Sequence, residues 1–248
     1  MLAATPLEGL PEVRPGDDLA GLIAEALPAK LRDGDLLAIA HKVVSKAEGR
    51  IRSLSAIAPG DRANELARRL QKDPRQVQAV LDESREVLRA ARGVLVCVTH
   101  HGFVCANAGV DASNVAVPDA VALLPRDPDG SARALRRRLR ELTGAAPAVL
   151  ITDTFGRAWR HGQAEVAIGC AGMGPLEDWR GRRDATGREL RATWIAVADQ
   201  AAAVADLVRR KDSREPVVLI RGLERLVTRD DGPGAAALVR PEQEDLFR

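Results

Sequence analysis

Apolar residues recur at helical spacing over residues 19–31, behind two aspartates that can cap a helix and complement its dipole. A turn-forming Asp-Gly-Asp follows at 33–35. The run LLAIAHKVV at 36–44 then has the length and β-branching of a buried strand. The start of the chain therefore predicts a helix, a tight turn and a strand at whose end functional side chains could gather.

The middle of the chain predicts two helices and a β-hairpin. Apolar spacing indicates helices over 62–70 and 74–91, with a proline in the first turn of the second and Gly93 as its end. Residues 94–99 form an apolar, β-branched run, and HHGFVCANAG after it contains a turn and a second short run. These two runs predict paired strands.

The second half continues the mixture of helices and strands. The patterns predict a helix at 131–142 ended by Gly144, a strand at 148–152, a strand at 166–174 running into a Gly-rich loop, a helix at 190–209 and a strand at 217–220. Residues after Leu226 are expected to be loosely ordered. Because strands and helices do not alternate regularly, the predicted fold class is α+β.

Composition narrows the possible partners. Hydrophobic residues are 46% and charged residues 29% of 248, which is typical of a globular protein. A net charge of +2 argues against a general nucleic-acid surface. The longest basic cluster lies within a leucine-periodic stretch, so it is either a solvated helix face or a phosphate or carboxylate contact; it comprises Arg136, Arg137, Arg138 and Arg140.

Cysteine usage and hydropathy indicate a cytoplasmic protein. The three cysteines have neither metal-ligand spacing nor an even count, and they are expected to be small core residues in a reducing compartment. The N-terminus lacks a signal-peptide pattern, and no run of about 18 apolar residues occurs. We therefore expect an unprocessed protein without a membrane partner.

A phosphate site must be built without a standard nucleotide signature, because neither GxxxxGK[ST] nor GxGxxG after a strand is present. The candidate segment is HKVVSKAEGR, in which Lys42 and Lys46 flank Ser45 and precede Gly49. Lysine ammonium groups suit phosphate oxygens, and glycine lets backbone N–H groups approach them. The alternative is that both lysines are ordinary surface residues.

Two further segments offer ligands for a hard cation. In NAGVDASNV, Asp111 and Asn114 lie in a Gly-containing turn; they suit Mg²⁺ or, alternatively, an Asx turn. In ITDTFGRAWRHGQ, a buried strand delivers Asp153 and Thr154 to its carboxyl end, where Asp153 could complete a metal pair with Asp111. Arg157 nearby could hold an anionic substrate or pair with a surface acid.

These motifs together resemble the coenzyme F420-0:L-glutamate ligase (gamma-glutamyl ligase) family. The resemblance extends from near the start of the chain to about Leu223. It is carried by LEGLPEVRPGDDLAGLI, DGDLLAIAHKVVSKAEGRI, HGFVCANAGVDASNV, LLPRDPDGSARALRRRLRELTG, VLITDTFGRAWRHGQAEVAIG and PVVLIRGL.

The resemblance implies roles for particular residues. It implies GTP as co-substrate, Mg²⁺ or Mn²⁺ as metal, and K⁺ as a further candidate cation. Asp111 and Asp153 would share one metal, with Thr154 at a second. Our candidate catalytic residues are Asp111, Asp153, Lys46 and Arg157. The implied nucleotide contacts are Glu8, Gly9, Leu10, Pro11, His41, Lys42, Lys46 and Asn114.

The sequence departs from the family pattern at two places. The family uses the loop at about 207–215 for nucleotide and metal, but here VRRKDSREP contains no glycine. Asp212 is the nearby acid, and Lys211 is a candidate to take the ligand position instead. His41 and Lys42 also stand where some relatives have smaller hydroxyl residues.

The implied protein is a single two-lobed α+β ligase module, residues 1–248, that forms an intertwined homodimer. It would be the stand-alone version, without a C-terminal flavin-reductase-like domain. GTP would phosphorylate the carboxylate of the phospholactyl arm of F420-0, and L-glutamate would attack the acyl phosphate. From the residues alone, a metal-dependent phosphate hydrolase and a non-catalytic nucleotide-binding subunit remain alternatives.

Overall fold

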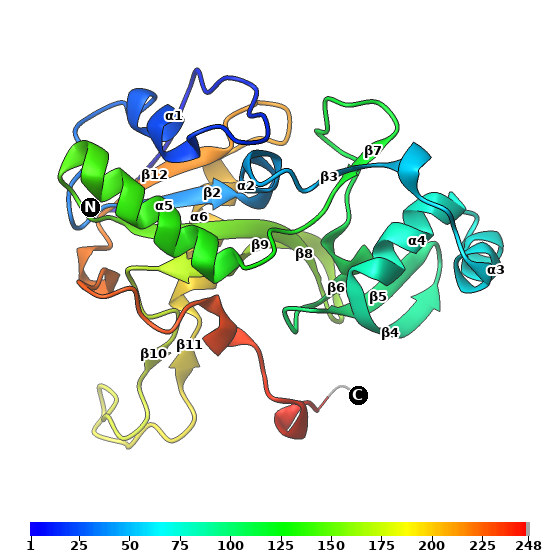
Figure 1. The fold of residues 1–248 in the computed structure, drawn as a ribbon. Coiled ribbons are helices and arrows are strands. Elements are labelled where there is room, and N and C mark those ends of the chain that lie inside the picture. The colour runs from blue at the N-terminus through cyan, green and yellow to red at the C-terminus, as the bar shows by residue number, and fades with distance from the viewer. Residues whose placement is uncertain (247–248) are drawn as a thin grey trace.

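A five-stranded mixed sheet forms the centre of the protein (Figure 1). The computed structural model describes residues 1–246. The strand order is β1-β12-β2-β8-β9, and only the central pair, β2 with β8, is parallel. The strands are β1 (Ala3–Pro6), β2 (Leu36–Ala40), β8 (Ala148–Arg157), β9 (Arg160–Ala171) and β12 (Val217–Arg221).

Helices cover both faces of this sheet, as the alternation of buried residues along β2 shows. Leu37 and Ile39 pack into one core with helices α1 (Leu19–Glu25) and α5 (Pro128–Thr143). Leu36 and Ala38 point to the opposite face and pack with α6 (Val197–Val208). Successive side chains of a strand point to opposite faces, so a continuous apolar run is expected when both faces are covered.

A smaller unit with its own core lies beyond the sheet (Figure 1). Helices α3 (Asp61–Leu70) and α4 (Pro74–Asp82) pack on a three-stranded antiparallel sheet. That sheet comprises β4 (Ser84–Ala91), β5 (Val94–Thr99) and β6 (Val104–Ala106). The remaining strands form two short pairs outside this unit's sheet. They are β3 (Ile51–Ser53) with β7 (Ala120–Ala122), and β10 (Glu177–Asp178) with β11 (Trp194–Ile195).

The predicted strand over 36–44 is wrong in its second half. The strand ends at Ala40, and α2 (His41–Ala47) begins at the next residue. Two adjacent valines favoured a strand, but the buried positions His41, Val44 and Ser45 have the i, i+3, i+4 spacing of a helix face. Packing of this face decides the local structure.

The predicted helix over 74–91 is also only half correct. α4 ends at Asp82, and β4 pairs antiparallel with β5. Gly93 does not end a helix; with Arg92 it forms the turn of this hairpin, and both residues have positive φ (52° and 75°). A two-residue turn of that conformation matches the twist of paired strands. The predicted pairing of 94–99 with the following short strand is confirmed.

Further element boundaries differ from prediction. Strands 148–152 and 166–174 were predicted too short, because β8 and β9 continue as a paired hairpin through Arg157 and Arg160. The helix predicted over 190–209 begins only at Val197, since Trp194 and Ile195 pair with β10. The helix ended by Gly144 is confirmed, and Gly144 has the left-handed conformation (φ 76°) of a helix C-terminus.

The segment after Leu226 was expected to be loosely ordered, but much of it packs on the body. Ala235 is fully buried in the same core as α6. The Asp129 carboxylate accepts hydrogen bonds from the backbone N–H groups of Ala235 (2.7 Å) and Ala236 (3.1 Å). Short 3₁₀ helices occur at Glu224–Leu226, Ala235–Leu238 and Glu242–Glu244.

The basic cluster on α5 is not simply a solvated face, because Arg136 is buried. Its guanidinium donates to the Asp231 carboxylate at 2.7 Å and to the carbonyl oxygens of Thr228 and Pro147. Arg138, on the same helix, is half exposed and pairs with Asp18 and Glu141. One member of the cluster therefore anchors the C-terminal segment rather than binding an external anion.

The cysteines are buried, as the sequence predicted. Cys97, Cys105 and Cys170 are free thiols, and burial raises the pKa of Cys105 and Cys170 to about 12. A thiol with so high a pKa carries almost no thiolate at neutral pH and is a poor nucleophile. Within residues 1–246, no helix combines the length and apolar character needed to cross a lipid bilayer.

The close approach of α5 to β9 generates a stability prediction. A Cβ at Gly169 would lie 2.4 Å from the Pro128 carbonyl oxygen, whereas a Cβ at Gly156 would meet nothing within 4 Å. We expect Gly169→Ala to lower the free energy of unfolding by about 1–3 kcal/mol through overpacking. Gly156→Ala is the matched control and should change it by less than about 0.5 kcal/mol in urea denaturation. Equal effects would contradict the close packing of this strand on α5.

Candidate functional site

A cleft of about 910 Å³ lies at the carboxyl end of β2 and beside the middle of β8. The parallel register pairs Ala40, the last residue of β2, with Thr152 of β8, so the residues that follow each of them lie at the same edge of the sheet. Open sheets with parallel strands commonly bind ligands at such an edge. Five segments line the cleft: residues 10–13, 40–46, 111–116, parts of 152–165, and 209–216.

Helix α2 begins directly at the end of β2 and directs its first residues into the cleft. His41 is buried, and Lys42 and Lys46 follow on the same helix. The Lys46 ammonium contacts the Glu12 carboxylate at 2.5 Å. Both lysines therefore lie in the cleft, as the phosphate-site hypothesis requires, and each is already paired with a carboxylate.

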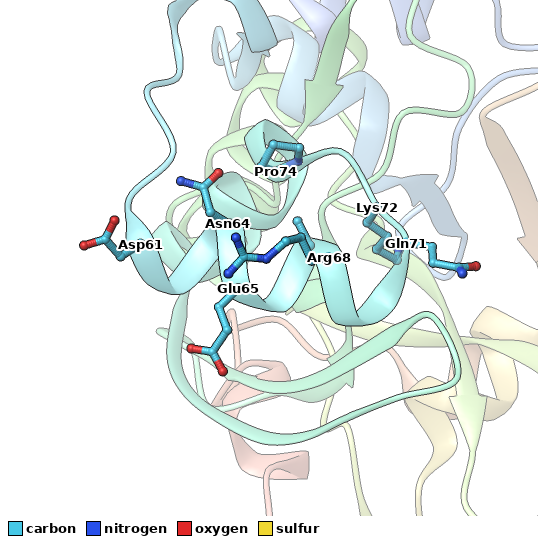
Figure 2. Close-up of a pocket in the computed structure, with 8 residues that line it drawn as sticks. Asp61, Asn64, Glu65, Arg68, Gln71, Lys72 and Pro74 are labelled. Atoms are coloured by element: carbon cyan, nitrogen blue, oxygen red, sulfur yellow. The ribbon is translucent and has the colours of Figure 1, made fainter.

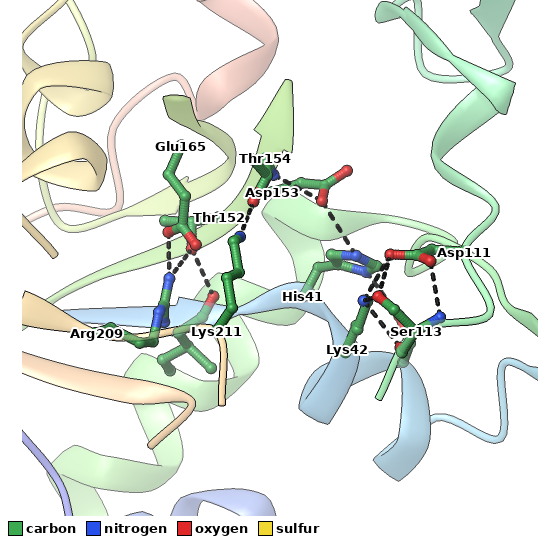
Figure 3. Close-up of polar contacts among 12 residues, drawn as sticks. His41, Lys42, Asp111, Ser113, Thr152, Asp153, Thr154, Glu165, Arg209 and Lys211 are labelled. Atoms are coloured by element: carbon green, nitrogen blue, oxygen red, sulfur yellow. Dashed lines mark hydrogen bonds and ion pairs between the residues drawn. The ribbon is translucent and has the colours of Figure 1, made fainter. Parts of the chain in front are cut away.

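Lys42 reaches from α2 to the loop that carries Asp111 (Figure 3). Its ammonium donates to Asp111 Oδ2 at 2.7 Å and to Ser113 Oγ at 2.7 Å. Ser113 also donates its backbone N–H to Asp111 Oδ1 at 2.8 Å, which is an Asx-type turn. Asp111 therefore closes the Asx turn that the sequence offered as one alternative, and its side chain also lines the cleft.

These contacts change the titration of Asp111. Burial alone raises the pKa of its carboxyl, but the hydrogen bonds from Lys42 and Ser113 lower it by more, and the net pKa lies below the ordinary value. The carboxyl is therefore ionised at neutral pH and available to a cation.

Asp153 lies between the two halves of the cleft, at the end of the buried part of β8 (Figure 3). Its Oδ1 accepts the backbone N–H of Thr154 at 2.7 Å and lies 3.3 Å from His41 Nε2. That second contact lacks hydrogen-bond geometry, so Nε2 is a buried polar atom without a hydrogen bond. His41 Nδ1 lies 3.3 Å from Ser45 Oγ.

The loop after α6 closes the other side of the cleft. The Lys211 ammonium donates to the Thr154 hydroxyl at 2.5 Å, and the Lys211 carbonyl oxygen accepts from the Asn114 amide at 3.5 Å. Behind this loop, the Arg209 guanidinium pairs with the Glu165 carboxylate inside the protein. Figure 3 shows Lys211 and Arg209 extending toward the strands from the same segment.

Most, but not all, of the predicted site residues come together here. The following line the cleft: Leu10, Pro11, His41, Lys42, Lys46, Asp111, Asn114, Asp153, Thr154, Lys211 and Asp212. Glu8 and Gly9 precede the lining segment and are exposed. Arg157 is exposed near the tip of the β8–β9 hairpin and donates to the His161 carbonyl oxygen at 2.6 Å. It does not line the cleft in this structure.

Sequence reasoning missed several polar residues of the cleft. Ser113 and Glu12 pair with the two lysines, and Glu165 and Arg209 form the buried pair. Glu165 could have been recognised from the sequence, because it is a lone acid at the start of the apolar run VAIGCA. Acids within such runs are rarely buried unless paired.

The donors of the cleft fit a divalent cation only if a ligand completes the site. Within residues 1–246, no three His, Cys, Asp or Glu side chains cluster as a protein-only metal site. Mg²⁺ is commonly held by one or two carboxylates together with substrate phosphates and water. Asp111 and Asp153, with the Thr154 hydroxyl, suit that arrangement.

A second hollow, of about 840 Å³, lies over α3 and is lined by Asp61, Glu65 and Arg68, among others (Figure 2). Its lining residues belong to α3, to the turn after it and to the first residue of α4. It includes none of the residues at the ends of β2 and β8, and no motif pointed to it.

Comparison with known proteins shows the family of the chain. The chain matches the F420-0:gamma-glutamyl ligase family over residues 9–222, which is most of its length. It belongs to the F420-0:gamma-glutamyl ligase family. The cleft-lining residues from Leu10 to Pro216 all lie within the matched region.

Curated relatives carry the name coenzyme F420:L-glutamate ligase. The protein from Methanopyrus kandleri is 51% identical over 96% of this chain and 94% of its own length. That from Methanothermobacter thermautotrophicus is 49% identical over 98% and 97%, and that from Archaeoglobus fulgidus is 46% identical over 98% and 95%. This member of the ligase family is therefore similar to those relatives almost from end to end.

The lowered pKa of Asp111 generates a pH prediction for this ligase-family member. The pKa of this carboxyl is lower in the folded protein than its ordinary value of 3.8. Such a group stabilises the folded protein above pH 3.8, and this stabilisation is lost as the pH falls through the pKa of the folded protein. We expect Asp111→Asn to be less stable than wild type at neutral pH, by a modest amount because the side chain is half exposed. Urea denaturation should show this difference shrinking below pH 3.8. A difference independent of pH would contradict the ionised Lys42–Asp111 pair.

Proposed function

We propose that this protein is a GTP-dependent ligase that joins L-glutamate to the phospholactyl carboxylate of F420-0. Two kinds of observation support the proposal. Relatives of nearly equal length are named as coenzyme F420:L-glutamate ligases. The cleft also gathers three lysine ammonium groups, from Lys42, Lys46 and Lys211, together with the carboxylates of Asp111 and Asp153.

The charge pattern of the cleft is the observation that carries the proposal. Phosphoryl transfer depends on placing the reactants and neutralising phosphate charge, and a protein nucleophile is not required. The lysines supply fixed positive charge on both sides of Asp153. Lys42 and Lys46 release carboxylate partners and Lys211 releases a hydroxyl when phosphate oxygens replace those contacts.

The proposed reaction has two steps. A carboxylate oxygen of F420-0 attacks the γ-phosphorus of GTP, the bond to the β-phosphate oxygen breaks, and GDP leaves. The glutamate nitrogen then attacks the acyl carbon, inorganic phosphate leaves, and the nitrogen loses its proton to form the amide. Lys42, Lys46 and Lys211 bind the phosphates, and the leading segment with Leu10 and Pro11 borders the nucleotide.

Asp111 and Asp153 are the proposed carboxylate ligands of a divalent ion, Mg²⁺ or Mn²⁺, with Thr154 beside them. The bound ion would add charge neutralisation to the phosphates. Asp153 is held in place by the Thr154 N–H, so its carboxylate is preoriented toward the cleft. Arg157 and the segment of Glu8 and Gly9 are proposed to contact substrate only if they move toward the cleft.

The direct test is product analysis with purified protein, GTP, Mg²⁺, F420-0 and L-glutamate. Mass spectrometry should detect F420-0 extended by glutamate, and GDP release over many turnovers should require both F420-0 and glutamate. GDP release at the same rate without glutamate or F420-0 would indicate a phosphate hydrolase. Nucleotide binding without turnover would indicate a non-catalytic subunit.

We expect Asp153→Asn to lower kcat by about 100-fold or more, because it removes charge where phosphate and metal are proposed to meet. Asp61→Asn is the control, since Asp61 is exposed in the hollow over α3. Both variants should retain wild-type unfolding transitions. A nearly wild-type rate for Asp153→Asn at limiting Mg²⁺ would refute the assignment of Asp153.

Lys46→Ala should raise the KM for GTP by about 10- to 100-fold, the effect of losing a hydrogen bond to a charged group. The KM for glutamate should change little, because the amine enters after phosphoryl transfer. Lys30→Ala, at an exposed position outside the cleft, is the matched control. If both KM values rise equally in steady-state kinetics, Lys46 has a structural role through Glu12 instead.

A further inference from the structure

The ion pair between Arg209 and Glu165 is buried at the rear of the cleft. The two side chains are only 7% and 5% exposed. The Arg209 guanidinium also donates to Thr152 Oγ1 at 3.0 Å and to the Pro216 carbonyl oxygen at 2.7 Å. None of these contacts involves a group placed in the reaction so far.

A buried ion pair is a weak source of stability, because removing two charges from water offsets much of their attraction. Its position suggests another use. Arg209 is the residue at which α6 ends, and Pro216 directly precedes β12. A single guanidinium therefore joins the start and the end of the loop 210–215, and ties both to β8 and β9.

The same loop carries Lys211 to Thr154. Thr154 and Glu165 are cross-strand partners in the β8–β9 hairpin, so the two contact points lie side by side in the sheet. Arg209 meets Glu165, and Lys211, two residues later, meets the Thr154 hydroxyl. Figure 3 shows these two contacts next to each other.

We propose that the Arg209–Glu165 pair is a positioning device that holds the Lys211 ammonium at the edge of the cleft. Arg209 then acts on phosphoryl transfer only through Lys211. The kinetic part of this inference rests on the proposed function, but the positioning itself does not. Fixing a cation before the reaction matters because misplacement by about 1 Å can cost about 100-fold in rate.

The chemical reactivity of Lys211 tests the positioning without any activity assay. Competitive acetylation, read by mass spectrometry, compares each lysine with exposed Lys30. Arg209→Lys keeps the positive charge but loses the planar guanidinium that donates several hydrogen bonds at once. We expect this variant to increase acetylation of Lys211 several-fold. Arg136→Lys is the matched control, because Arg136 is a buried arginine that pairs with Asp231, anchors the C-terminal segment and does not line the cleft. Unchanged Lys211 reactivity in Arg209→Lys would overturn the proposal.

A double-mutant cycle separates positioning from general stability. We expect Arg209→Lys to lower kcat by about tenfold or more, with little further loss when it is added to Lys211→Ala, because coupled residues are not additive. The double variant Arg209→Met/Glu165→Leu, which leaves no lone buried charge, should behave like Arg209→Lys if the latter folds poorly. Additive losses, or an equal loss in Arg136→Lys, would overturn the proposal.

The two claims can fail separately. If wild-type protein forms no glutamyl product but Lys211 acetylation rises in Arg209→Lys, the ligase proposal fails and the positioning device stands. If wild type is active and Lys211 reactivity does not respond, the positioning device fails and the ligase proposal stands.

Discussion

The parallel pairing of β2 with β8 is the constraint on which the site depends. It places Ala40, the last residue of β2, beside Thr152 within β8, so that the chain brings the next residue of each strand to the same edge of the sheet. From one strand it continues into α2 with His41, and from the other it delivers Asp153. Apolar residues on both faces of the strands fix this register, because a one-residue slip would turn buried side chains toward the wrong core.

Two lysine ammonium groups of the cleft are paired with carboxylates that phosphate oxygens of a ligand could replace. Lys42 pairs with Asp111 and Lys46 with Glu12, and both acids are about half exposed. Such pairs contribute only about 0–1 kcal/mol, so exchanging them costs little. The Arg209–Glu165 pair differs, because both of its side chains are buried at the rear of the cleft. Exchangeable pairs thus face the ligand, and the buried pair supports them.

The sequence predicted what depends on local patterns and missed what depends on distant contacts. Apolar runs identified β2, β8 and β12, and strand-end polarity identified Asp153 and Lys42. The boundary at His41 was missed because adjacent valines favour a strand until packing selects a helix face. Arg209 and Glu165 were missed because 44 residues separate them, and no local pattern shows that they meet.

The most direct test of the account is the fate of oxygen-18 placed in the phospholactyl carboxylate of F420-0. An acyl phosphate formed in this cleft transfers one labelled oxygen to the inorganic phosphate and leaves the other in the amide. We therefore expect phosphorus-31 NMR or mass spectrometry to detect one oxygen-18 in each phosphate released with the glutamyl product. Released phosphate without oxygen-18 would contradict the account, because its fourth oxygen would then come from water rather than from the carboxylate.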